Sequence, residues 1–211
     1  MIEITELSFS YKKTTVLNSL NLQLQSPGST LLSGANGRGK TTLLKLLAGV
    51  LTPTSGRITY DGVDIKGMKV AQLAKLRSVA PQRRSFDLAF TVNEILNIAD
   101  KESSRRSEII ERLELTPLLN ARITELSLGQ QQRVSVALAL LQESDYYLLD
   151  EPFSAQDSHF EAAMLALLHD IAQQKGVLVI SHHTDNVHTS FGFAITSVSY
   201  THLTLPTILR V

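Results

Sequence analysis

The chain has 211 residues, and its 20 Lys and Arg residues balance its 20 Asp and Glu residues, so broad electrostatic capture of nucleic acid is not expected. It contains no cysteine, which excludes a disulfide framework, a thiolate metal site and a cysteine nucleophile. No apolar run approaches the roughly 18 residues of a membrane span, and the first residues are too polar for a signal peptide, so we expect a soluble α/β domain in the cytoplasm.

The first eighty residues predict short strands around one helix. Alternating apolar and polar residues are typical of a half-buried strand, and a short apolar run is typical of a fully buried one. The predicted strands span residues 2–11 (with one slip at residues 5 and 6), 20–24, 29–33, 57–60 and 78–81. A leucine-rich helix is expected over residues 41–50, directly after a glycine-rich segment.

The middle of the chain predicts helices instead. Thr91 and Glu94 have the spacing of a capping box, and the apolar residues between positions 109 and 115 recur with helical spacing. The charged residues 101–106 between them are expected to form a solvated connection. Ser127 is expected to cap a further helix. We therefore predict a helical subdomain over about residues 85–140, inserted into the α/β core.

The last third returns to alternating elements. A strand is expected over residues 146–149, a helix over 160–171 and a strand over 177–180, and this alternation predicts a mostly parallel sheet. Residues 198–203 read VSYTHL, which resembles one reading frame of a sequencing-library adapter. We expect the native domain to span residues 1–197 and residues 198–211 to be a read-through tail; the alternative is an ordinary C-terminal strand.

Residues 34–41 read GANGRGKT and fit the pattern G-x-x-x-x-G-K-[ST] between a predicted strand and a predicted helix. Glycines let backbone N–H groups turn toward phosphates, and the helix N-terminus adds partial positive charge. Lys40 would neutralise the β- and γ-phosphates, and the Thr41 hydroxyl would bind Mg²⁺. The alternative is a glycine-rich surface turn. The predicted ATP-phosphate ligands are Gly34, Ala35, Asn36, Gly37, Arg38, Gly39, Lys40, Thr41 and Thr42.

Asp150 and Glu151 come directly after the predicted strand 146–149. A carboxylate at the end of a buried strand can hold Mg²⁺ against the phosphates on Lys40, and the next carboxylate can orient or deprotonate water. Alone, the pair could be a strand that ends in an acidic turn. No N-K-x-D guanine-reading motif occurs, so the combination predicts an ATPase rather than a GTPase.

Residues 126–133 read LSLGQQQR and lie shortly before Asp150. Together with the glycine-rich loop and the acidic pair, they resemble the signature of ATP-binding cassette (ABC) ATPases, the motor subunits of ABC transporters. That signature is usually written LSGGQ, so Leu128 replaces a glycine. The resemblance covers residues 1 to about 197. By themselves, these residues could equally form a Ser-capped amphipathic helix.

The resemblance implies a P-loop NTPase core with a mostly parallel sheet, an N-terminal antiparallel β subdomain and an inserted α-helical signature subdomain. It also implies roles for single residues. Tyr11 would stack on adenine, although it could be an ordinary strand-end tyrosine. Residues 154–157, SAQD, resemble a loop usually written SALD that crosses the dimer interface. The residues expected to contact ATP on the opposite subunit are Ser127, Gly129 and Gln130.

Further along the chain, the resemblance implies in-line attack of water on the γ-phosphate, with Glu151 as general base. His182 would contact the γ-phosphate, and Gln82 would reach toward Mg²⁺ and the attacking water. Mg²⁺ would be held by Thr41, Gln82 and Asp150. Whether His183 shares the role of His182 stays open. A histidine-rich metal cluster is the weaker alternative, and it would comprise His182, His183, Asp185 and His188.

The implied partners are a second ABC ATPase subunit and an integral membrane transporter subunit, with no nucleic acid, at the cytoplasmic face of the membrane. Residues 73–82 and 90–96 look somewhat like importers of metal ions or metal chelates. The alternatives are an exporter subunit, a fragment of a translation or DNA-repair ATPase of the same family, and a nucleotide-binding regulator without turnover.

Overall fold

The computed structural model describes residues 1–35, 37–82, 84, 86, 89–99 and 105–182, together with the backbone of residues 193–196. Its strands form two sheets, one with the order β2-β1-β4-β5 and one with the order β6-β7-β8-β3-β9. The first sheet is antiparallel and comprises β1 (Ile2–Tyr11), β2 (Thr14–Leu24), β4 (Ser55–Tyr60) and β5 (Val63–Asp64). The second is parallel and comprises β3 (Gly28–Ser33), β6 (Arg77–Ala80), β7 (Tyr146–Asp150), β8 (Gly176–Ile180) and β9 (Phe193–Thr196).

An irregularity in β1 explains the slip in its alternation. Glu6 has a φ of 48°, and the pairing of β1 with β2 shifts between Ile4 and Leu7. An extra residue in a strand reverses the faces of the residues that follow it. The alternation of apolar and polar residues slips at the same place, so it compensates for this reversal. Ile4 and Leu7 are therefore both buried.

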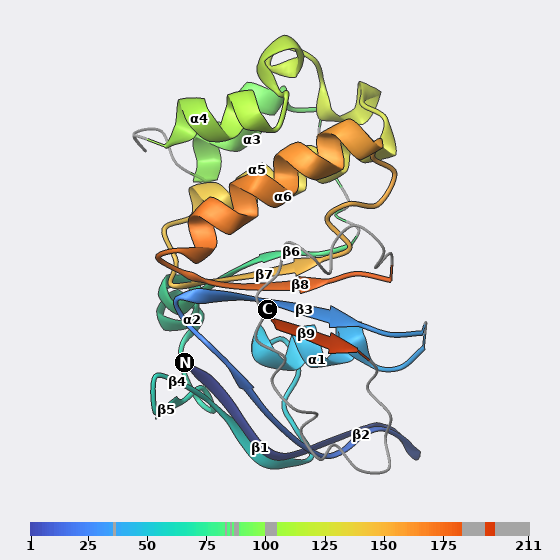
Figure 1. Ribbon diagram of the computed structural model, residues 1–211, viewed down its shortest axis with the longest axis vertical. Helices are drawn as coiled ribbons and strands as arrows, with labels where there is room; N and C mark the ends of the chain where they lie inside the picture. The colour runs from blue at the N-terminus through green and yellow to red at the C-terminus, as the bar shows by residue number, and fades with distance from the viewer. Residues whose placement is uncertain are drawn as a thin grey trace.

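The central strands β3, β7 and β8 of the parallel sheet are buried on both faces, which is why they read as mostly apolar runs. Successive residues of β7 point to opposite faces. Leu148 packs into the core shared with α1 (Lys40–Leu47) and the antiparallel sheet, whereas Leu149 packs into the core shared with the helices. In Figure 1, α1 lies between the two sheets, while α5 (Leu128–Leu141) and α6 (Ser158–Ala172) cover the other face of the parallel sheet.

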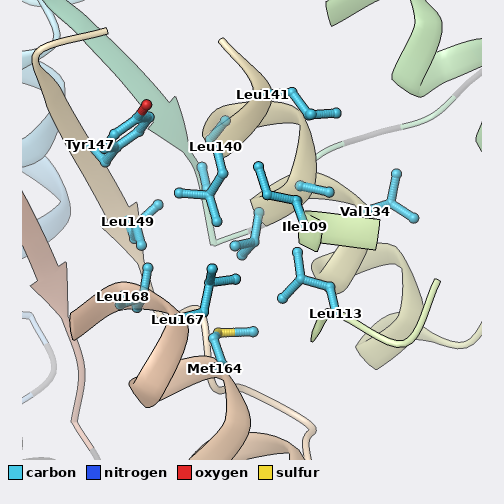
Figure 2. Packing of buried hydrophobic residues seen from close by; sticks show 14 of the residues in the cluster. Ile109, Leu113, Val134, Leu140, Leu141, Tyr147, Leu149, Met164, Leu167 and Leu168 are labelled. Carbon is cyan, nitrogen blue, oxygen red and sulfur yellow. The ribbon is translucent and has the colours of Figure 1, made fainter. Parts of the chain in front are cut away.

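The helices that precede α5 in the insertion between β6 and β7 pack on the outer side of α5, and one of them also contacts α6. Ile109 of α4 (Arg106–Arg112) meets Val134 of α5 and Met164 of α6 in one apolar cluster that continues to the sheet (Figure 2). The predicted capping box forms at the start of α3 (Val92–Ala99), since the Glu94 N–H donates to Thr91 Oγ1 at 3.2 Å and the Thr91 N–H donates to Glu94 Oε2 at 2.8 Å.

The predicted fold class is confirmed: an α/β fold with a parallel sheet, an antiparallel N-terminal sheet and a helical insertion between β6 and β7. Among the described elements, the sequence did not predict β5, β9, α2 (Val70–Leu76) or the two 3-10 helices, Thr116–Leu118 and Ile123–Glu125. The predicted connection 101–106 ends earlier than expected, because Arg106 begins α4. The predicted tail, residues 198–211, lies outside the described residues. Within the described ranges, no helix has the length and apolar character needed to cross a membrane.

Candidate functional site

The predicted site residues lie at one edge of the parallel sheet. β3, β7 and β8 are neighbouring parallel strands, so their carboxyl ends meet at the same edge. The glycine-rich loop follows β3, the acidic pair ends β7, and His182 follows β8. Ligands of open α/β sheets bind at this edge, outside the carboxyl ends of the strands.

The loop before α1 adopts a conformation that depends on glycine. Gly37 and Gly39 have φ values of 77° and 76°, a left-handed region that other residues rarely adopt, and Gly39 precedes the first turn of α1. The Lys40 side chain is buried and folds back over the loop, where its ammonium donates to Gly34 O at 2.5 Å and to Ala35 O at 3.1 Å. Asn36 lies outside the described residues.

Asp150 connects β7 to this loop. Its Oδ2 accepts a 2.9 Å hydrogen bond from the Thr41 hydroxyl, although the two residues are 109 positions apart. The carboxylate is buried, and burial raises the pKa of Asp150. Within the described part of the chain, Asp150 Oδ1 has no hydrogen-bond partner. A buried carboxylate oxygen without a partner, beside a hydroxyl, suits a Mg²⁺ ion, which prefers oxygen ligands.

Glu151 is held in a defined orientation at the start of the next turn. His182 Nδ1 lies 2.7 Å from Glu151 Oε1, and the His182 N–H donates to Glu151 Oε2 at 3.4 Å. The backbone of Glu151 has a φ of 52°, a left-handed conformation that is strained for a non-glycine residue. Its carbonyl accepts from the Gln132 side chain at 3.5 Å, and its N–H donates to Ile180 O at 2.8 Å. These contacts hold the strained turn in place.

The loop and the two carboxylates face one cleft of about 420 Å³. This volume lies within the range of small-molecule sites, roughly 300–1,000 Å³. The lining residues are Val16, Gly37, Arg38, Gly39, Lys40, Thr41, Thr42, Gln82, Asp150 and Glu151. The cleft therefore brings together backbone N–H groups, one ammonium, one orphaned carboxylate oxygen and the Glu151 carboxylate, a set suited to transferring a phosphoryl group to water. His182 contacts that carboxylate but is not among the lining residues.

Val16 is the lining residue that the sequence did not predict. It lies on β2, which pairs with β1, and its side chain is half-buried. Tyr11, which was predicted to stack on adenine, ends β1 and is 45% exposed. It packs edge-on against Phe9, with ring centroids 4.8 Å apart, and is not among the lining residues. No sequence pattern distinguished Val16 from the other apolar residues of β2.

The signature segment, residues 126–130 (LSLGQ), lies at the start of α5. Ser127 caps the helix, because the Gln130 N–H donates to Ser127 Oγ at 3.2 Å and the Ser127 N–H donates to Gln130 Oε1 at 2.9 Å. The Leu128 side chain is 78% exposed. Among the described residues, the lining of the cleft includes none of Ser127, Gly129 and Gln130.

His183, Asp185 and His188 lie outside the described residues, so the possible histidine-rich metal cluster stays a prediction. Among the described residues, no group of three or more His, Asp and Glu side chains could hold a metal ion.

Residues 17–154 match the family model described as ABC transporter. The chain is 33% identical over 207 residues to the hemin import ATP-binding protein HmuV of Rhizobium meliloti, covering 90% of this chain and 79% of that protein. It is 30% identical over 196 residues to the zinc transport system ATP-binding protein TroB of Treponema pallidum, covering 86% of this chain and 72% of that protein. The fold is similar to a dimeric bacterial ABC transporter cassette, MJ0796, with a TM-score of 0.82, 23% identity and coverage of 93% and 94% of the two chains.

Proposed function

The chain belongs to the ABC transporter family and is an ATP-binding subunit with ATPase activity, and from this premise we propose that it powers a membrane transporter by closing with a second ATPase subunit over ATP. The observation that carries the proposal is the cleft in which Lys40, Asp150 and Glu151 converge. The same cleft lacks contact with Ser127 and Gly129 of its own chain, as far as the described residues define it.

The exposure of Ser127 and Leu128 in the signature segment supports action on the nucleotide of a second subunit, although Gly129 beside them is buried. Leu128 is largely exposed, and among the described residues the side chains of Ser127 and Gln130 each accept a hydrogen bond only from the backbone N–H of the other. A two-fold pair places identical surfaces against each other, so two sites would form at once, each with one P-loop and one signature segment. ATP between the subunits then favours the closed pair, and its hydrolysis removes that preference.

Within each site, the residues would divide the work as follows. The amides of residues 37–42 and the Lys40 ammonium would bind the phosphates, and Tyr11 would stack on adenine. Thr41, Gln82 and Asp150 would hold Mg²⁺, which when bound supplies positive charge next to the β- and γ-phosphates. Glu151 would accept a proton from the attacking water at its carboxylate, and His182 would keep that carboxylate oriented toward the γ-phosphate.

The transporter is proposed to import a metal ion or a metal chelate. Two relatives with 30–33% identity are named for zinc transport and hemin import, and residues 73–82 and 90–96 favour the same group. The chain would lie at the cytoplasmic face of the membrane, bound to an integral membrane subunit that supplies the path.

The first test measures the assembly. Analytical ultracentrifugation of the Glu151→Gln protein should show monomers without nucleotide and dimers with Mg²⁺ and ATP. The same protein with Ser127→Arg added should stay monomeric under both conditions while retaining ATP binding. A Ser127→Arg protein that dimerises normally would refute action across the interface.

The second test addresses the cargo. The full chain is purified together with its membrane subunit, reconstituted in vesicles and supplied with ATP on the side of the ATPase. Uptake of zinc or of hemin into the compartment that holds the ATPase supports import of a metal ion or a metal chelate. Movement in the opposite direction overturns import, and transport of neither probe overturns zinc and hemin as the cargo.

A further inference from the structure

The loop formed by residues 154–157 packs closely against the start of α5. A Cβ atom added at Gly129 would lie 2.6 Å from Ala155 O, a separation that real Cβ atoms essentially never show. Ala155 has a φ of 60°, which is strained for alanine, so this loop conformation depends on surrounding contacts. The glycine of the signature segment is therefore required by a neighbour within the same chain.

Gln156 supplies hydrogen bonds that hold this contact. Its Nε2 donates to Gly129 O at 2.8 Å, and its Oε1 accepts from Arg133 Nε at 2.9 Å. Both groups of the amide are thus used, one toward each side of the first turn of α5. The family pattern usually has leucine at this position, and a leucine side chain could make neither bond.

Arg133 is itself fixed by two further contacts. Its Nη1 donates to Glu114 Oε2 at 2.5 Å, and its guanidinium lies 3.7 Å above the ring of Phe160 in α6. Only 14% of its side chain is exposed. A planar guanidinium held by a carboxylate and an aromatic ring has little freedom, so it offers Gln156 an anchor with a defined position.

We propose that Gln156 is a positioning residue for ATP hydrolysis, which locks the loop 154–157 to the signature segment of its own subunit so that both meet the second subunit as one rigid surface. This inference rests on the proposed closure of two subunits over ATP. Gln156 acts through Gly129 and Ala155 rather than by touching the nucleotide. Its loss should lower the rate of turnover without weakening the binding of ATP to the P-loop.

Two substitutions separate the two bonds. Gln156→Met keeps the length of the side chain and removes both bonds, whereas Gln156→Glu keeps the acceptor for Arg133 and removes the donor to Gly129 O. We expect both variants to lower kcat by at least about fivefold, the effect of losing the bond to Gly129 O that neither variant can make, with KM for ATP unchanged. Gln23→Met, at an exposed position of β2 whose amide contacts Glu3, serves as the matched control.

Amide hydrogen exchange provides a readout that needs no turnover. In the full-length protein without nucleotide, exchange at residues 128–133 should be several-fold faster in Gln156→Met than in the wild type and unchanged in Gln23→Met. Unchanged exchange in Gln156→Met overturns the lock, and this result stands whether or not the protein hydrolyses ATP. Faster exchange with a normal kcat, or a raised KM with a normal kcat, overturns the role in hydrolysis. A normal kcat in Gln156→Glu overturns the assignment to the Gly129 bond.

Discussion

The Thr41 hydroxyl donates a 2.9 Å hydrogen bond to Asp150 Oδ2, and this bond joins the first turn of α1 to the end of β7. It satisfies one carboxylate oxygen and leaves the other, buried Oδ1 without a partner among the described residues. The protein thus buries a charge that it does not fully compensate. Such a site favours binding of a cation at the expense of the stability of the nucleotide-free fold.

Asp150→Asn should therefore stabilise the nucleotide-free protein at pH 7, because it removes a buried charge and retains an acceptor for Thr41. The pKa of Asp150 is raised by burial, so the folded state binds its proton more tightly than the unfolded state does. This group stabilises the fold below the ordinary pKa of aspartate, and that contribution is lost as the pH rises through the raised value. We expect Asp150→Asn to gain about 1 kcal/mol, which corresponds to a rise of about 2–4 °C in Tm for a chain of this size.

Thermal unfolding between pH 4 and pH 8 measures this effect. The difference in Tm between Asp150→Asn and the wild type should shrink toward low pH, where Asp150 becomes protonated. Addition of Mg²⁺ and ATP should raise the Tm of the wild type more than that of Asp150→Asn. Asp145→Asn, which alters an exposed carboxylate paired with Lys175, is the control. A difference that does not change with pH would show that the charge of Asp150 is not its cause.

Glu151→Gln should lower the rate of ATP hydrolysis about 10²–10⁴-fold, the usual contribution of a general base. Glutamine can keep the contact with His182 but cannot take a proton from water, so ATP binding should persist. Single-turnover hydrolysis with radiolabelled ATP measures the chemical step. Glu143→Gln, at an exposed position before β7, should hydrolyse ATP normally. Normal single-turnover hydrolysis by Glu151→Gln would remove this residue from the role of base.

Lys40→Met should weaken the binding of ATP far more than the binding of AMP. The Lys40 ammonium is buried and held by Gly34 O and Ala35 O, so it already lies inside the loop that would surround the β- and γ-phosphates. Isothermal titration should show a loss of at least about tenfold in ATP affinity, equivalent to 1.4 kcal/mol. Lys66→Met, at an exposed position after β5, should bind both nucleotides normally. An equal loss for ATP and AMP would indicate that the loop itself has collapsed.

The elements that could be predicted are those with local signals. Thr91, Glu94 and Ser127 lie within three residues of the groups that they cap, and the slip at residues 5 and 6 is a local change of period. The P-loop (residues 34–41) and the acidic pair, Asp150 and Glu151, could also be predicted, because the chemistry of phosphate binding requires fixed residue types at fixed spacing.

The contacts that could not be predicted join residues far apart in sequence. Gln156 meets Gly129 across 27 positions, and Val16 reaches the cleft only because β2 pairs with β1. Neither contact leaves a periodic pattern. The short strand β5 pairs through only two residues, Val63 and Asp64, too few to show an alternation.

Substitutions at Ser127 can separate its role in the fold from its role in hydrolysis. Ser127 Oγ caps α5 by accepting from the Gln130 N–H, and aspartate is an equally good capping residue. Ser127→Asp should therefore keep the stability of the wild type. It should nevertheless abolish ATP hydrolysis, because it would place a negative charge against the γ-phosphate of the second subunit.

The capping residue of α3 provides the reverse control. Thr91→Ala should lower the free energy of unfolding by about 1 kcal/mol, because it removes the same kind of cap, but basal hydrolysis should persist since Thr91 lies outside the lining of the cleft. Urea unfolding and steady-state hydrolysis, measured on both variants, distinguish the role of Ser127 in the fold from its role in hydrolysis. If Ser127→Asp retains hydrolysis, the signature segment does not face a phosphate in the working assembly. If it loses stability as Thr91→Ala does, its inactivity reports only the loss of the cap.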